Sequence, residues 1–180
     1  MTLKNGPAEF GLVTRVIHWG MMLLIFGQLA LGLRIESMEP GLANLWLYGL
    51  HKTIGVILLA LILLRITWHL ASPPPPPLGP RNALFWAARA AHWVIYTLLI
   101  VIPLTGWAGS SATGIDVMFA DRWTLPPLVD ASEQAEAFWF GMHDILTKLL
   151  MALIALHVLG AAKRQIDGDG TLTRMIRGKA

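Results

Sequence analysis

The chain has 180 residues, of which 55% are hydrophobic and only 14% are charged, and its mean hydropathy is +0.58. A soluble globular domain carries about 25% charged residues, so this chain has too few to cover a surface exposed to water. It has no cysteine, which excludes disulfides, thiolate metal sites, iron–sulfur clusters and covalently attached c-type haem. Basic residues are not interleaved with exposed aromatic residues, so we expect no nucleic-acid partner.

Four stretches are long and apolar enough to cross a bilayer as helices, which takes about 20 mainly apolar residues. They lie near Val13–Leu33, Trp46–Trp68, Trp86–Gly109 and Trp139–Ala161. Three of them begin or end at a tryptophan, as is typical of the lipid headgroup level. The first begins too deep in the chain, and lacks the small-residue cleavage site, for a signal peptide. We therefore predict an all-α fold, an integral-membrane four-helix bundle that forms a single domain over residues 1–180 and is surrounded by membrane lipid.

Proline and serine residues indicate how the spans are interrupted and connected. Five consecutive prolines, Pro73–Pro77, cannot form a helix and predict a stiff polyproline II segment between the second and third spans. Pro103 lies inside the third span, where it removes a backbone hydrogen bond and predicts a kink. In the long segment Ser110–Phe138, Ser132 is a candidate N-cap with two glutamates in the following turn, which predicts a short helix beginning there.

Charged residues are divided unevenly between the two sides of the predicted bundle. Of the 14 basic residues, 10 lie on the side that holds both chain ends and the proline segment, whereas 8 of the 11 acidic residues lie on the other side. Cytoplasmic segments of membrane proteins are enriched in Lys and Arg. The N- and C-termini are therefore predicted to be cytoplasmic.

Five of the six histidines fall inside the predicted spans, where an ionisable residue is costly and is a functional candidate by default. They form two layers, one near each membrane face. The inner layer consists of His18, His92 and His157 on the first, third and fourth spans, and the outer layer of His51 and His143 on the second and fourth.

The two histidines of the fourth span are the most informative. His143 and His157 are 14 residues apart, about 21 Å along a helix axis, and at about 100° per residue they leave nearly the same face. The second imidazole of the outer layer can only be His51, whereas the inner layer offers either His18 or His92. Two bis-imidazole sites stacked across a bilayer are the geometry for two b-type haems, for which histidine is a common iron ligand.

Simpler explanations compete with this interpretation. A single intramembrane histidine often forms an interhelical hydrogen bond. A structural zinc site or a metal or proton transporter is a weaker alternative, because zinc ligands are usually closer in sequence and include carboxylate or cysteine. Gly20, Gly55 and Gly160 lie close to histidines in the sequence and leave room either for a flat macrocycle or for close helix packing.

Two basic residues are candidate partners for the negatively charged propionates of haem. Arg15 lies three residues before His18, and Lys52 adjoins His51. A propionate near the membrane surface requires a cationic or hydrogen-bonding partner. The alternative is that both residues are topology signals, or extend toward the lipid headgroups.

The residues around these histidines resemble the bacterial cytochrome b561 family. The matching segments are Arg15-Val16-Ile17-His18-Trp19, His51-Lys52-Thr53-Ile54-Gly55, His92-Trp93-Val94-Ile95-Tyr96, and His143-Asp144 with His157, in order over essentially the whole chain. The resemblance implies a four-helix protein of the bacterial inner membrane that binds two haems b. It implies that His18 and His157 ligate the iron of the cytoplasmic-side haem, and that His51 and His143 ligate that of the periplasmic-side haem.

The best-understood activity in that family is superoxide oxidase, which passes an electron from periplasmic superoxide through the haems to ubiquinone. The resemblance therefore implies transmembrane electron transfer between a periplasmic small-molecule or protein partner and the ubiquinone pool, with His92 near the quinone. On this hypothesis the protein would be a superoxide:ubiquinone oxidoreductase whose chemistry belongs to the haems. The alternative is a non-catalytic cytochrome b subunit that passes electrons to a separate enzyme docked on the acidic outer segment Asp116–Glu136.

Overall fold

A computed structural model describes residues 2–179 of the chain. Within this range the structure contains four helices that are long and apolar enough to cross a membrane. They are α1 (Leu12–Glu36), α2 (Leu45–Ala71), α3 (Ala83–Ala112) and α4 (Glu133–Ile166). Each expected span lies within one of these helices, and α3 continues through Pro103. The predicted all-α membrane four-helix bundle is confirmed.

Short elements connect the helices. The 3-10 turn η1 (Leu42–Asn44) leads into α2, an antiparallel hairpin of β1 (Val117–Phe119) and β2 (Trp123–Leu125) follows α3, and α5 (Thr171–Arg177) follows α4. Neither the hairpin nor α5 was expected from the sequence, because both are too short for a hydrophobic period to identify them.

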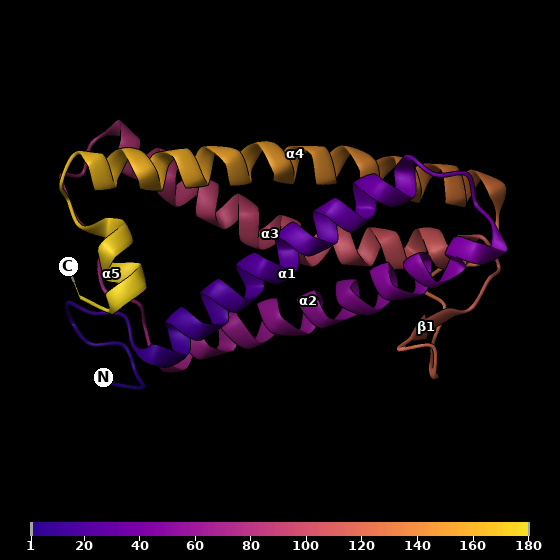
Figure 1. Cartoon of the computed structure of the whole chain (residues 1–180), viewed down its shortest axis with the longest axis horizontal. Helices are drawn as coiled ribbons and strands as arrows, with labels where there is room; N and C mark the ends of the chain where they lie inside the picture. Colours follow the sequence, from indigo (N-terminus) through magenta and orange to yellow (C-terminus); the bar gives the residue numbers. More distant parts are fainter. Residues whose placement is uncertain (1, 180) are drawn as a thin grey trace.

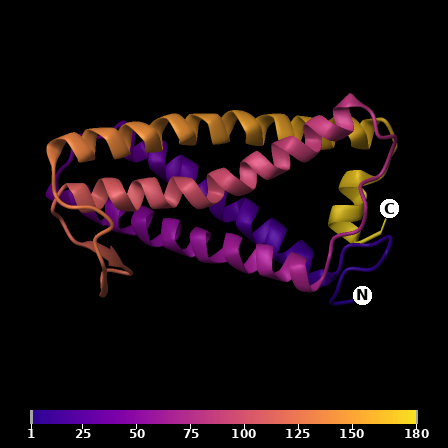
Figure 2. The same cartoon turned by 180° about the vertical axis from the view of Figure 1, so that it is seen from behind.

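Neighbouring helices along the chain are also neighbours in space. α1 packs against α2, α2 against α3, and α3 most extensively against α4. In Figure 1, α1 runs diagonally across the bundle, from the end of α2 near the chain termini toward the opposite end of α4, and Figure 2 shows the same crossing from behind. Because α1 diverges from α4 toward the end that holds the termini, side chains from three or four helices can face a common interior there.

The tightly buried core is small. It is the cluster Met21, Ile62, Leu98, Leu99 and Leu150, to which all four long helices contribute. Elsewhere many large apolar side chains are exposed on the outside of the bundle, and Trp93 is 69% exposed. An apolar surface of this extent requires hydrocarbon rather than water as its solvent. The burial pattern thus agrees with a bundle that is inserted in lipid.

Both chain termini lie at one end of the bundle, as four successive spans require (Figures 1 and 2). There the proline segment is held through its carbonyl oxygens, which have no partners within a polyproline helix and accept hydrogen bonds from other segments. Arg174 of α5 is buried and donates from Nη1 to the Pro76 oxygen at 2.9 Å, while its guanidinium lies 5.2 Å from the centre of the Phe10 ring. Asn5 binds the end of α2 by donating to Ser72 through its backbone and side-chain nitrogens. The N-terminal segment, the proline segment and α5 thus form one continuous cap, which on the predicted topology is cytoplasmic.

The turn from α4 into α5 is held by an ion pair outside the membrane span. Arg164 Nε lies 2.5 Å from an oxygen of Asp169, and the same carboxylate accepts the backbone N–H of Thr171 at 2.8 Å. Burial acts to raise the pKa of Asp169, but these hydrogen bonds outweigh it and hold the pKa below its ordinary value. Arg164 also donates to the Leu78 oxygen and so connects this turn to the proline segment.

Ser132 begins α4 itself rather than a separate short helix. Its hydroxyl oxygen accepts the Ala135 N–H at 3.4 Å, and α4 then runs without interruption from Glu133 into the fourth span. The sequence therefore placed the cap correctly but divided one helix into two, because the polar first turns outside the membrane obscure its continuity with the apolar span.

Candidate functional site

Four of the predicted histidines meet as two pairs between helices. His51 of α2 faces His143 of α4 with ring centres 6.2 Å apart, and His18 of α1 faces His157 of α4 with ring centres 6.4 Å apart. All four side chains are half-buried. α4 therefore supplies one imidazole to each pair, as the 14-residue spacing predicts.

The separation within each pair matches what a shared metal ion requires. A metal–imidazole nitrogen bond is about 2.0 Å long, and the ring centre lies about 1 Å behind the nitrogen, so a metal between two imidazoles places their centres about 6 Å apart. Among the described residues no group of three or more His, Asp or Glu could hold a metal ion. A zinc site needs about four protein ligands, whereas haem iron needs only the two axial ones. The donor sets therefore fit haem and not structural zinc.

His92 lies beside the inner pair but at a different spacing. Its ring centre is only 5.0 Å from that of His157, too close for a metal ion between the two rings. His92 is exposed, and its Nδ1 lies 2.6 Å from the Ala88 oxygen. Because a carbonyl oxygen only accepts hydrogen bonds, Nδ1 of the neutral ring carries the proton. Nε2 then has a lone pair that can accept a hydrogen bond. Between the two candidates for the inner partner, this spacing favours His18.

The orientation of His143 is set by the backbone of α3. Its Nδ1 donates to the Ile102 carbonyl oxygen at 2.9 Å, with the Thr105 hydroxyl 3.3 Å away. An imidazole whose Nδ1–H is held by a carbonyl presents the lone pair of Nε2, which is the usual arrangement around a ligating histidine. In the His51 layer, the buried His51 Nδ1 and Gln28 Oε1 have no hydrogen-bond partner among the described residues. Since buried polar atoms are normally paired, these two atoms indicate that a further group binds in the outer layer.

Glycines make room for the outer pair. A Cβ on Gly106 would lie 3.0 Å from His143 Cε1, and one on Gly32 would lie 3.3 Å from His51 Cε1. Neither glycine is evident from the sequence, because both are distant in sequence from the histidines they accommodate. Of the glycines that lie close to histidines in the sequence, Gly20 and Gly160 would place a Cβ where no atom lies within 4 Å. Close helix packing therefore does not explain those two.

The two predicted propionate partners, Arg15 and Lys52, lie in different surroundings. Arg15 is buried and, with Phe10 and Arg177, lines a polar cavity of about 360 Å³ among the terminal segments. Lys52 is half-buried and takes part in none of the ion pairs found among residues 2–179. The basic side chain that faces an imidazole pair is Arg65, whose Nη1 lies 3.1 Å from His18 Nδ1.

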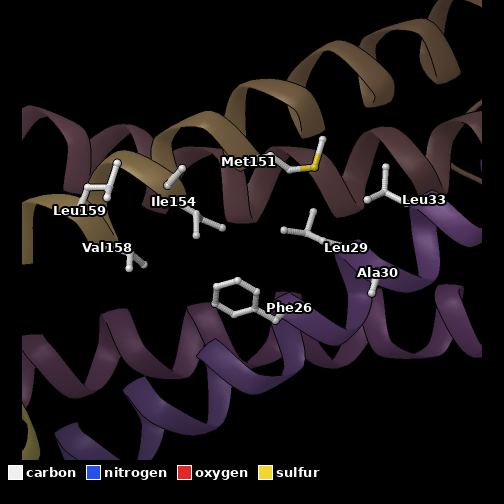
Figure 3. Close-up of a pocket in the computed structure, with 9 residues that line it drawn as sticks. Phe26, Leu29, Ala30, Leu33, Met151, Ile154, Val158 and Leu159 are labelled. Carbon is white, nitrogen blue, oxygen red and sulfur yellow. The ribbon is translucent and has the colours of Figure 1, made fainter. Parts of the chain in front are cut away.

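An apolar cleft of about 570 Å³ lies between α1 and α4 (Figure 3). It contains no ionisable side chain, so it offers no acid, base or nucleophile. Its walls suit the hydrophobic rim of a macrocycle or a hydrocarbon chain. The lining residues are Phe26, Leu29, Ala30, Leu33, Met151, Ile154, Ala155, Val158 and Leu159.

Comparisons with known proteins identify a matching family and two relatives. The family model described as prokaryotic cytochrome b561 matches residues 9–178. The chain is 33% identical to cytochrome b561 homolog 2 of Escherichia coli (strain K12), in an alignment that covers 98% of this chain and 95% of that protein. It is 29% identical to the probable superoxide oxidase CybB of Yersinia pestis, over 89% of this chain and 91% of that protein.

The contact between Gly106 and His143 yields a test of the outer pair. We expect Gly106→Val to displace the His143 ring, because even the Cβ would lie 3.0 Å from Cε1, well inside the optimal carbon–carbon contact of about 3.5–4.0 Å. The measurement is haem per chain, from the reduced-minus-oxidised absorption spectrum of the purified protein. Gly141→Val is the matched control, since a Cβ there meets no atom within 4 Å. Equal haem content in both variants would contradict the placement of Gly106.

Proposed function

Because the chain belongs to the prokaryotic cytochrome b561 family, we propose that it transfers electrons through two b-type haems between a periplasmic donor and the membrane ubiquinone pool. It is a multi-pass protein of the bacterial inner membrane, and its family implies b-type haem and transmembrane electron transfer. The proposal adds the number of haems, their ligands and the two redox partners. The observation that carries it is the presence of two imidazole pairs, at 6.2 and 6.4 Å, that share α4.

Four histidines would hold the haem irons, with His18 and His157 on the cytoplasmic side and His51 and His143 on the periplasmic side. Each b-type haem, when bound, carries one electron by alternating between ferric and ferrous iron. His143 is already oriented for ligation by its hydrogen bond to Ile102. The cleft between α1 and α4 is lined by apolar side chains alone, which suits the hydrophobic rim of a haem.

At the periplasmic face, the candidate donor is superoxide, in line with the printed name of the Yersinia pestis relative. An anionic substrate is attracted by nearby positive charge. Lys148 is paired with Asp144 at 2.7 Å and Arg122 lies over the Trp123 ring. Lys52, which adjoins His51 and has no ion pair among the described residues, is therefore the cation we assign either to attracting this anion or to a haem propionate.

The overall reaction balances in electrons and protons. Two superoxide anions each lose one electron and become O₂, while one ubiquinone gains those two electrons and two protons and becomes ubiquinol. We assign His92 to the quinone end. Its Nδ1 is held by Ala88, so its Nε2 is free to bind a quinol hydroxyl or to take and return a proton.

A second candidate is a cytochrome b subunit without catalysis of its own. It is favoured by exposed acidic residues on this side of the bundle, which are Asp116, Asp121 and Asp130 between α3 and α4 and Glu133 at the start of α4. Such a surface complements a basic protein partner. In that case electrons would pass to or from a separate enzyme docked on the hairpin side.

The proposal is tested with the purified protein alone, supplied with a superoxide source and a short-chain ubiquinone. We expect quinol to form, and its formation to stop when superoxide dismutase is added. Activity that appears only with a co-purifying subunit would instead support the second candidate. A purified protein without any b-type absorption would overturn both.

Removal of one outer ligand tests the assignment of the ligands. We expect His143→Ala to leave about one haem per chain, because the inner pair does not include that residue. The measurement is haem per chain together with the spectrum of the remaining haem. His69→Ala is the control, since it removes a histidine that lies just beyond the second predicted span and belongs to neither pair, and it should keep both haems. Loss of both haems in His143→Ala would show that the two sites are not independent.

Removal of His92 separates its role from ligation. We expect His92→Ala to keep both haems and to slow quinone reduction about a hundredfold, the lower end of the effect of losing a proton-transfer partner. The measurements are haem per chain and the rate of quinol formation at saturating donor. If one haem is lost instead, His92 rather than His18 is the inner ligand.

A further inference from the structure

Arg65 is a positive charge inside the membrane span of α2. None of the ion pairs found among residues 2–179 includes it. A guanidinium at membrane depth is costly unless it faces the bundle interior and meets a partner. Arg65 is half-buried and faces inward, toward His18 and α3.

Tyr96 of α3 holds this guanidinium in place. Arg65 Nε donates to the Tyr96 hydroxyl oxygen at 2.8 Å, and the guanidinium carbon lies 5.5 Å from the centre of the tyrosine ring. The phenolic proton of Tyr96 is then free to be donated to His69 Nδ1, 3.3 Å away. Arg65 is thus held through Nε, and its Nη nitrogens can donate hydrogen bonds to a group beside His18.

Hydrogen-bond chemistry identifies what these nitrogens require. A guanidinium has only donors. The contact of Nη1 with His18 Nδ1 at 3.1 Å needs Nδ1 to accept. When His18 ligates iron through Nε2, Nδ1 carries the proton, and two donors then face each other. The guanidinium must therefore find an acceptor close to His18, and a carboxylate is the acceptor that it binds most strongly.

We propose that Arg65, positioned by Tyr96, binds a propionate carboxylate of the cytoplasmic-side haem and raises the reduction potential of that haem. This inference rests on the proposed function, since it assumes a haem between His18 and His157. A fixed positive charge favours the reduced state, because reduction adds a negative charge nearby. The effect is local to the inner pair, so it favours electron transfer toward the cytoplasmic side.

The test is a potentiometric titration of the haem absorbance in purified, haem-loaded protein. We expect Arg65→Gln to raise the oxidised-to-reduced ratio of the inner haem about tenfold at a fixed ambient potential, which is about 59 mV for a one-electron couple. The outer haem should not change. The His143→Ala variant, which should keep only the inner haem, identifies the component to follow. Arg65→Lys, which keeps the charge, should shift the ratio less than Arg65→Gln.

Arg89→Gln is the matched control. Arg89 lies at a similar depth in α3 but is exposed, and the structure gives it no hydrogen bond or ion pair. Arg89→Gln therefore removes the same charge as Arg65→Gln, but from a residue that does not contact His18. An equal shift in Arg89→Gln would mean that the bulk charge of the cytoplasmic face sets the potential, and would overturn the assignment to Arg65.

Tyr96→Phe tests the positioning role and remains informative if Arg65→Gln does not assemble. It keeps the ring and removes only the hydroxyl that anchors Nε. We expect a shift of the same sign as in Arg65→Gln but smaller, whereas a tyrosine that merely packs would leave the potential unchanged. If the wild type binds two haems and reduces quinone while Arg65→Gln and Tyr96→Phe titrate like the wild type, this inference fails and the proposed function stands.

Discussion

The low dielectric of the bilayer is the constraint on which the rest of this structure depends. A polar side chain in hydrocarbon must find a partner, and five imidazoles lie at membrane depth here, together with basic side chains such as Arg65. The structure brings four of these imidazoles together between the helices, as one pair at each of two levels. α4 contributes one histidine to each level, His157 to the inner pair and His143 to the outer pair, so this helix sets the distance between the two pairs.

Different groups hold the histidines at the two levels. In the outer layer, α3 orients His143 through the Ile102 carbonyl, and Gly106 leaves room for its ring. In the inner layer, a side-chain network connects His18 to Arg65, Tyr96 and His69 across three helices. The outer pair is thus oriented by a backbone carbonyl, whereas the inner pair lies next to the positive charge of a guanidinium. If each pair holds a haem, as proposed, this difference favours different reduction potentials at the two levels.

The cap at the terminal end explains the unusual proline segment. A polyproline stretch has carbonyl oxygens but no N–H groups to offer, so it can only accept hydrogen bonds. Arg174 and Arg164 supply the donors, and the N-terminal segment binds the end of α2 through Asn5. The basic residues that indicate a cytoplasmic face therefore also hold that face together.

The sequence by itself determined the four spans, because a helix of about 20 mainly apolar residues is stable in lipid rather than in water. It also determined the two histidine layers, because helical rise and rotation are fixed. It also indicated the family through the segments around His18, His51, His92 and His143. It could not choose between His18 and His92 by spacing, since two helices at equal depth look alike along the chain. Only the tertiary structure decided which rings face each other at about 6 Å, that Gly106 accommodates His143, and that Arg65 Nη1 lies beside His18 Nδ1. Those relations depend on how helices cross and rotate against one another, which no single helix encodes.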